Sequence, residues 1–297
     1  MSKKLFNILM TLMLGVMALG GSSCLRDGME ECPPLKVRIV VKDRNYFNVD
    51  ATQLEERKAD DLPFAEYVPN ICWVMRNAET GETVDYKRLH DVDPEVDEVV
   101  LDFPEDLPFG KYEITVWGGF RNGSTLEERS EYLDLHKGEV EGDDVYLAHA
   151  IIDYNFNSGT HTLEMQRTKG KLIVQKENFP EWVASDWKRM TGLYGRVTNG
   201  FGYSGEARLH VKNALEYSDN IVTKHLAAPT PGKIGKLNID LFDAAGMKRY
   251  STEEVTIPIM RNSLTVVRYV YDPTTDECKI YILINDTWEI VNQMVVD

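Results

Sequence analysis

The stretch HTLEMQRTKGKLIVQ (residues 161–175) contains the end of one strand pattern and the beginning of another. Apolar and polar residues alternate up to about Met165, and a second alternation begins after a Thr-Lys-Gly break. In a chain of 297 residues, such a change near the middle indicates a boundary between two domains. We therefore predict one domain over residues 35–165 and a second over residues 166–297.

Short alternating segments lie on both sides of this boundary, separated by turn-forming residues. The first, LKVRIVVKD (35–43), places four apolar residues on one face, namely Leu35, Val37, Ile39 and Val41. The other expected strands are 67–75, 97–103, 110–120, 144–152, 170–177, 190–198, 206–212, 235–244, 253–259, 263–272 and 278–284. Because no parallel crossovers are evident, this spacing predicts an all-β fold of two tandem antiparallel β-sandwich domains.

Two segments depart from the alternation. TLEERSEYLDL (125–135) is expected to be a helical or irregular insertion, and FPEWVASDW (179–187) a short helix. Charged residues inside strands, Arg167, Arg208 and Arg268, are expected on the solvent face, where they would also protect sheet edges.

The start of the chain has the layout of a secretory leader. Two lysines precede an apolar run (5–20), which is shorter than the ~20 residues that a membrane-spanning helix needs. Small residues then lead to Cys24, and the segment resembles a bacterial lipobox, with Gly21 where leucine is usual. We predict a signal peptide over residues 1–23 and a lipidated tether over 24–34. Simple secretion, with Cys24 free or in a disulfide, is the alternative.

The charge balance limits the partners of the mature chain. Removing residues 1–23 leaves 274 residues and changes the formal net charge from −15 to −17. Such an acidic surface repels nucleic-acid phosphates and anionic lipid headgroups, so membrane contact would depend on the lipid. With Cys24 lipidated, three cysteines remain, and Cys32 with Cys72 is the favoured disulfide over Cys278 because both lie in the same half of the chain.

No motif in the chain indicates catalysis, a metal site or a cofactor. GFGYSG (200–205) fits a dinucleotide-binding pattern by letter, but an alternating segment follows it where a helix would be needed, so we interpret it as a turn or bulge. DVDPEVDE (91–98) lacks the glycine of a calcium loop and is interpreted as a solvated acidic loop, with weak calcium binding as the alternative. The six histidines show no zinc-ligand spacing. We therefore expect no enzyme activity.

CLRDGMEECP (24–33), a cysteine followed by an acidic Cys-Pro, resembles the start of the FimB-type fimbrial anchor subunits, which are lipoproteins related to the fimbrillins of type V pili. Further segments resemble the same family, and together they cover nearly all of the mature chain: GKYEITVWGGF (110–120), LEMQRTKGKLIV (163–174), IPIMRNSLTVVRYVYD (257–272) and YILINDTWEIV (281–291).

This resemblance implies two tandem β-sandwich domains with a transthyretin-like Greek-key arrangement. It also implies attachment: the lipid on Cys24 would hold the base of a pilus in the outer membrane, and the partner would be a fimbrillin stalk subunit bound by strand exchange. The residues expected at the subunit contact are Leu35, Val37, Ile39, Val41 and Trp288.

A surface glycan-binding lipoprotein is the alternative function. Exposed aromatic residues usually form such sites, and Trp117, Trp182 and Trp187 are the candidates. The simpler interpretation of most of these rings is core packing, because large aromatic side chains dominate sandwich interiors.

Overall fold

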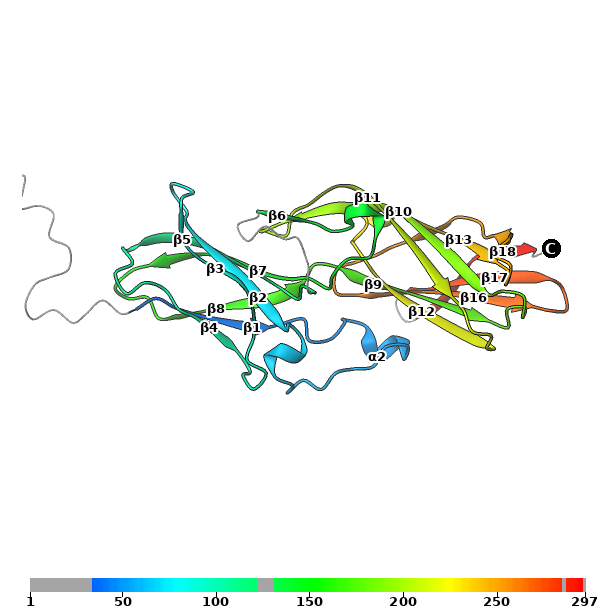
Figure 1. The fold of residues 1–297 in the computed structure, drawn as a ribbon, viewed down its shortest axis with the longest axis horizontal. Helices are drawn as coiled ribbons and strands as arrows, with labels where there is room; N and C mark the ends of the chain where they lie inside the picture. Colours follow the sequence, from blue (N-terminus) through cyan, green and yellow to red (C-terminus); the bar gives the residue numbers. More distant parts are fainter. Residues whose placement is uncertain (1–33, 122–130, 285–286, 296–297) are drawn as a thin grey trace, which may run out of the picture.

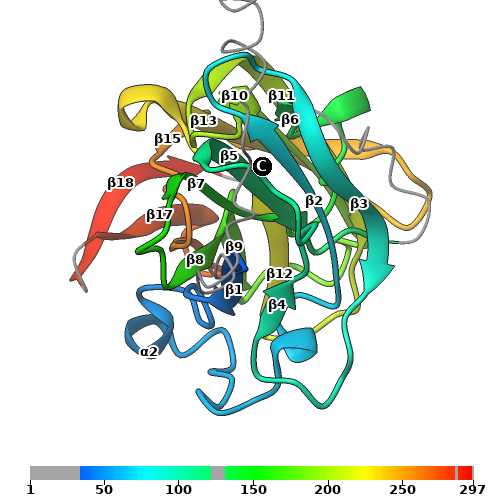
Figure 2. The same ribbon diagram turned by 90° about the vertical axis from the view of Figure 1, so that its left-hand side faces the viewer.

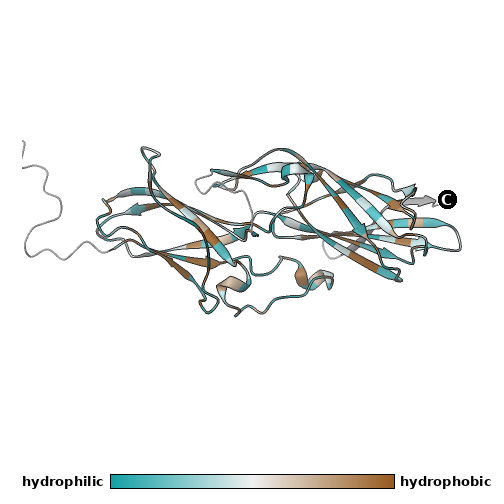
Figure 3. Cartoon of the chain, in the orientation of Figure 1, coloured by the Kyte–Doolittle hydropathy of each residue, from teal (hydrophilic) through white to brown (hydrophobic). Residues whose placement is uncertain are grey.

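Strands dominate the computed structural model, which describes residues 34–121, 131–284 and 287–295 (Figure 1). The two halves of the chain follow one another along the long axis of the molecule (Figure 1). Hydrophobic and hydrophilic residues alternate along many of the strands (Figure 3), as the period-two pattern predicts. The prediction of an all-β fold is confirmed.

The first half forms one seven-stranded sheet in the order β3-β2-β5-β7-β8-β1-β4. Its strands are β1 (Lys36–Val41), β2 (Asn70–Asn77), β3 (Thr83–Asp91), β4 (Val99–Leu101), β5 (Gly110–Gly118), β7 (Tyr146–Tyr154) and β8 (Thr160–Arg167). The strands β8, β1 and β4 lie on one side and β3, β2, β5 and β7 on the other (Figure 2). Side chains from both groups, among them Ile39 and Ile114, form a single hydrophobic cluster.

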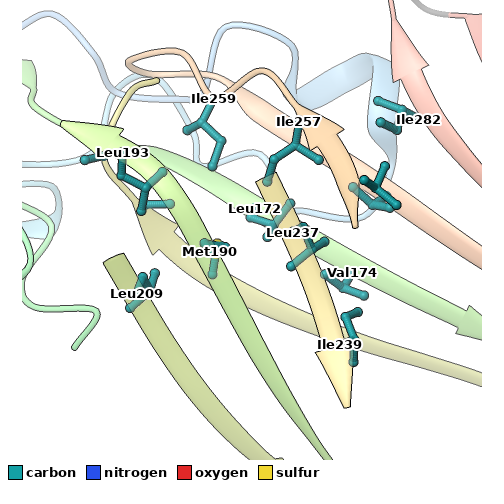
Figure 4. Packing of buried hydrophobic residues seen from close by; sticks show 14 of the residues in the cluster. Leu172, Val174, Met190, Leu193, Leu209, Leu237, Ile239, Ile257, Ile259 and Ile282 are labelled. Atoms are coloured by element: carbon teal, nitrogen blue, oxygen red, sulfur yellow. The ribbon is translucent and has the colours of Figure 1, made fainter. Parts of the chain in front are cut away.

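The second half contains two sheets. One has the order β11-β10-β13-β14, with β15 paired to β13 and β6 paired to β10, and the other has the order β12-β9-β16-β17-β18. The strands are β6 (Tyr132–Asp134), β9 (Gly170–Glu177), β10 (Ser185–Thr198), β11 (Tyr203–Ala214), β12 (Asn220–Ala227), β13 (Gly235–Phe242), β14 (Lys248–Ser251), β15 (Val255–Ile257), β16 (Leu264–Asp272), β17 (Glu277–Ile284) and β18 (Thr287–Val295). Val174 from β9 and Met190 from β10 lie in the cluster between the sheets (Figure 4).

Two strand pairs are parallel, although the sequence predicts antiparallel sheets. β1 pairs in parallel with β8, and β9 pairs in parallel with β16. In each half the first strand thus lies beside a strand that is distant in sequence, with most of that half between them. A sequence pattern that shows only short hairpin-like connections does not reveal such pairs.

A long connection between β1 and β2, residues 42–69, extends from the first half to the second; we call it the arm. It carries the short helix α2 (Val49–Thr52) and the 3-10 turn Phe64–Glu66. Two further 3-10 turns in the described part of the chain are Lys137–Glu139 and Pro231–Lys233. In Figure 1 the arm runs below the strands, and α2 lies beneath the second half. Tyr46 and Val49 of the arm pack with residues of β9 and β16 in a separate small hydrophobic cluster.

Of the two segments expected to depart from the alternation, the short helix at 179–187 is wrong. Residues 179–187 form a turn, with the Val183 N–H donating to the Pro180 carbonyl oxygen over 3.0 Å, and then the start of β10. Phe179 and Val183 mimic a helical spacing because both side chains enter the core from this turn. Of the segment 125–135, the part up to residue 130 lies outside the described residues, and the remainder forms β6.

Candidate functional site

The strand β1 carries most of the predicted subunit-contact residues. Leu35, Val37, Ile39 and Val41 are at most 5% exposed and belong to the core of the first half. β1 pairs with β4 on one edge and with β8 on the other. The strand therefore completes the core of its own half. The fifth predicted contact residue, Trp288, lies far along the chain in β18, where its backbone pairs with Leu283.

The two arginines nearest to β1 differ in their environment. Arg38 lies within the strand and pairs with Val100 of β4 and Thr162 of β8. Its guanidinium is near Glu98, at 3.4 Å. Arg44 lies just after the strand, and its Nε donates to the Val41 carbonyl oxygen over 3.3 Å. Protease access to the chain after Arg38 would thus require β1 to separate from both neighbours.

A group of polar residues, which we call the junction cluster, links the end of β1 to the second half. Asp43 follows β1, and its Oδ2 accepts hydrogen bonds from the Arg167 backbone N–H at 2.9 Å and from Arg261 Nη1 at 3.0 Å. Arg167 Nη1 donates to the Asp43 carbonyl oxygen at 2.9 Å and to Asn262 Oδ1 at 3.1 Å. Its Nε forms an ion pair with Asp144 at 3.1 Å. The cluster therefore joins β1, β7, β8 and the β15–β16 connection.

Arg167 is the centre of this cluster, and the expectation that it lies on the solvent face is wrong. Its side chain is 7% exposed. The guanidinium lies over the rings of Tyr46 and Tyr146, at 4.4 Å and 4.9 Å from the ring centroids. Burial raises the pKa of both tyrosines, so they stay neutral beside the cation. Of the other two arginines, Arg208 is exposed, and Arg268 is half-buried with its Nε 2.6 Å from Glu177 Oε1; both thus retain contact with solvent.

The arm makes a second set of contacts with the second half. Asn48 Nδ2 donates to the Leu264 carbonyl oxygen, and Asn48 Oδ1 accepts the Leu264 N–H, over 2.9 Å and 2.8 Å. The Glu55 carboxylate forms two ion pairs, with Oε1 2.6 Å from Lys171 Nζ and Oε2 2.8 Å from Lys224 Nζ. Burial would raise the pKa of Glu55, but the hydrogen bonds from the two lysines outweigh it and lower that pKa. The arm is thus fixed to the second half by hydrogen bonds and ion pairs as well as by apolar packing.

Two of the four cysteines, Cys72 and Cys278, lie in the described part of the chain. Cys24 and Cys32 lie outside the described residues. Cys72, the predicted disulfide partner of Cys32, is buried in β2, so the pairing stays a prediction. Cys278 is a free thiol in the core of the second half, where burial raises its pKa to about 12.

The three tryptophans proposed for glycan contact do not form a common surface. Trp117 is 1% exposed and belongs to the core, so its role as a surface contact is excluded. Trp182 is half-buried and packs against the same core. Trp187 is half-buried on β10, with Lys212 Nζ 5.2 Å from its ring centroid and the His210 ring edge-on to it.

A polar pocket of about 750 Å³ lies where the β10–β11 hairpin meets β6 and the 3-10 turn after it. It is lined by Asp134, His136, Lys137, Gly138, Glu139, Gly195, Arg196, Ser204, Gly205, Glu206, Ala207 and Arg208. Arg196 pairs with Asp134 at 3.0 Å and covers the Tyr132 ring at 3.7 Å from its centroid. The glycine-rich segment 200–205 lies in the hairpin turn and the start of β11, as its interpretation as a turn predicts. Sequence patterns do not indicate this pocket, because its lining comes from two segments that are distant in sequence, 134–139 and 195–208.

Among residues 34–121, 131–284 and 287–295, no group of three or more His, Cys, Asp or Glu side chains is arranged to hold a metal ion. Within those ranges, no helix has the length and apolar character needed to cross a membrane.

Comparisons with known proteins give matches in structure only. No family model and no curated protein matches the chain by sequence. A candidate adhesin from Bacteroides ovatus is 12% identical, with a TM-score of 0.55 over 92% of this chain and 99% of that chain. A candidate polysaccharide-binding protein from Bacteroides thetaiotaomicron is 11% identical, with a TM-score of 0.55 over 87% and 98%. The fimbrial anchor protein Mfa2 from Porphyromonas gingivalis is 12% identical, with a TM-score of 0.47 over 88% and 97%.

A fimbrial anchor protein is thus among the solved structures that are similar to this chain. At these identities a structural match describes the path of the backbone and does not transfer an activity. The chain shares its fold with the two Bacteroides proteins over almost the whole length of each.

Proposed function

We propose that this chain is a non-catalytic lipoprotein of the FimB-type fimbrial anchor family, which holds or caps the base of a fimbria at the outer membrane. The residues that resemble this family and the leader before Cys24 support the proposal. In this proposal the two halves are tandem β-sandwiches of the transthyretin-like Greek-key type. Their separate sheets and their two large hydrophobic clusters are consistent with that arrangement.

The state of β1 is the observation that carries the proposal. A subunit that polymerises by strand exchange must open a groove in its core, so that the strand of a neighbour can add to the exposed sheet edges. In this chain β1 completes the core of the first half, with Val37 and Ile39 at 0% exposure and with partners on both edges. A chain that keeps β1 could join a fimbrillin stalk subunit through one exchange only. It would then begin or end a filament without propagating it.

The decisive experiment is N-terminal mass spectrometry of the protein isolated from cells that carry fimbriae. An anchor is expected to start at a lipidated Cys24 and to retain β1. A mature start at Ile39 or Asn45, directly after Arg38 or Arg44, would identify a polymerising subunit and refute the proposal.

The polar pocket supports a second candidate function, the binding of a surface glycan. Carboxylates, Arg208 and the guanidinium of Arg196 face this space, and such groups form hydrogen bonds with sugar hydroxyls. Calorimetric titration of the protein with host and bacterial glycans tests this function, with Arg196→Ala as the comparison. Binding that disappears in the variant would favour it, and the absence of binding to any glycan would remove it.

A further inference from the structure

The core of the second half contains charged residues that the anchor function does not use. Lys176 of β9 and the pair Asp186 and Lys188 of β10 are at most 1% exposed. They share the inward faces of their strands with Val174 and Met190, which Figure 4 shows in the core, because residues two apart on a strand point the same way. Two lysines and one aspartate therefore face each other between the two sheets.

The contacts in this group are short and converge on Lys188. Its Nζ lies 2.7 Å from each carboxylate oxygen of Asp186 and 2.7 Å from Oδ1 of Asn213. Asn213 lies on β11 directly opposite Asp186 in the strand register. Lys176 forms an ion pair with Asp186 from the other sheet. An amine, a carboxamide and a carboxylate thus meet at one point.

The charges of the group do not balance if both lysines are protonated, because one positive charge then remains in the core. An uncompensated buried charge costs several kcal/mol, so the group gains stability when one lysine is neutral. Burial and the nearby Lys176 lower the pKa of Lys188 to about 7. A neutral lysine amine in an apolar site is a nucleophile, and it is held here against an amide carbonyl group.

We propose that Lys188 and Asn213 form an intramolecular isopeptide bond, with Asp186 as the group that transfers the proton. The neutral Nζ attacks Cγ of Asn213, the Nζ–Cγ bond forms and the Cγ–Nδ2 bond breaks. Asp186 takes a proton from Nζ and delivers it to Nδ2, which leaves as ammonia. No oxidant, reductant or other reactant is required, and the product is a neutral amide that retains one N–H.

Two features of the site favour this step. The reacting groups are fixed on adjacent strands, and intramolecular reactions between groups held in this way reach effective concentrations of ~10⁵–10⁸ M. The bond also removes the amine that cannot be charged without cost, so it leaves Lys176 and Asp186 as a balanced ion pair. The product would cross-link β10 to its edge neighbour β11, and it would stiffen a domain exposed to pulling forces.

Mass spectrometry of the full chain, purified from its own membrane and digested with trypsin, tests the proposal. The bond predicts one branched peptide, in which ENFPEWVASDWKR (177–189) is joined to NALEYSDNIVTK (213–224). Its mass should be about 17 Da below the sum of the two peptides, because the amide NH₂ leaves with one hydrogen as ammonia. Two separate unmodified peptides in the wild-type protein would overturn the proposal. A loss of about 18 Da with a link at Asp186 would overturn the choice of Asn213, because a carboxylate releases water.

Variants distinguish the formation of this bond from other reactions that release ammonia. Asn213→Ser and Lys188→Arg should each abolish the branched peptide, and Asp186→Asn should reduce it at least tenfold although both reacting groups remain. A succinimide at an Asn-Gly sequence, such as Asn199-Gly200, loses the same mass but reopens at alkaline pH and joins no second peptide. Persistence of the branched peptide in Asn213→Ser would also refute the assignment. Because the wild-type spectrum alone decides whether the bond exists, a variant that fails to fold leaves the test intact.

Discussion

Replacement of Arg167 by alanine is expected to lower the free energy of unfolding by about 3 kcal/mol. The side chain is 7% exposed, and its removal leaves the Asp43 carbonyl oxygen and Asn262 Oδ1 without their donor. Loss of one partner from a buried ion pair costs ~3–5 kcal/mol. We take the lower end of that range because Asp144 is 33% exposed and can recover hydration.

A matched variant distinguishes burial from charge. Arg196 forms a similar ion pair with Asp134 at 3.0 Å, but the two side chains are 42% and 45% exposed. Exposed ion pairs contribute ~0.2–1 kcal/mol and the contact of Arg196 with the Tyr132 ring ~0.5–1 kcal/mol, so Arg196→Ala should cost at most about 2 kcal/mol. Urea denaturation followed by circular dichroism and tryptophan fluorescence measures both. If Arg167→Ala costs no more than Arg196→Ala, the junction cluster does not hold the two halves together as we describe.

Three further predictions concern other parts of the chain. Burial lowers the pKa of His136 from 6.5 to about 4. The stability that depends on neutral His136 is therefore complete above about pH 6.5 and falls by about 3 kcal/mol as the pH drops towards 4. Denaturation of His136→Gln at several pH values should show a smaller loss of stability over this range. Gly119→Ala should cost about 1–3 kcal/mol more than Gly81→Ala, because both glycines have positive φ but only at Gly119 would a Cβ meet the Asp144 carbonyl oxygen. Thermal unfolding of the two variants measures this difference, and equal costs would contradict the steric argument. Cys24→Ser should abolish acyl labelling and release the protein from the membrane fraction, and continued membrane binding would contradict the lipidation.

Strands with one apolar face were predictable, including the edge strands β4 and β11, whereas the edge strands β3 and β14 were not. β9 spans the predicted residues 170–177, because Gly170 and the positive φ of Asn178 limit a clear alternation. β3 and β14 lie at the ends of their sheets, and most of their side chains are at least partly exposed. An edge strand of this kind needs no apolar face, so its sequence resembles that of a loop.

The buried charged residues could not be predicted for a different reason: their positions in the strands indicate burial, but their residue type does not. Strand parity places Lys176 beside Val174 and Lys188 beside Met190 on inward faces, so the sequence contained the positional signal. Charged side chains are rarely buried without partners, so residue type alone places Lys176, Lys188 and Arg167 on the solvent face. Their partners come from other strands, at distances in sequence that periodicity does not encode. The alternation of faces along a strand is therefore better evidence of burial than residue type where a neighbour on the same face is apolar.

Removal of β1 has an energetic consequence that separates an anchor from a polymerising subunit. Full burial of an apolar side chain of this size is worth ~1.5–3 kcal/mol, so four such residues approach the ~5–15 kcal/mol that stabilise a whole domain. All four apolar residues of the first strand segment are buried, and a cut after Arg44 would remove them together. The arm would remain held by Asn48 and Glu55, but the first half would lose four buried residues of its core. The junction cluster would lose Asp43 and with it the contact to Arg261. Only a replacement strand from another subunit could restore that core. A subunit at the base of a filament, with none below it, can therefore remain folded only if it retains β1.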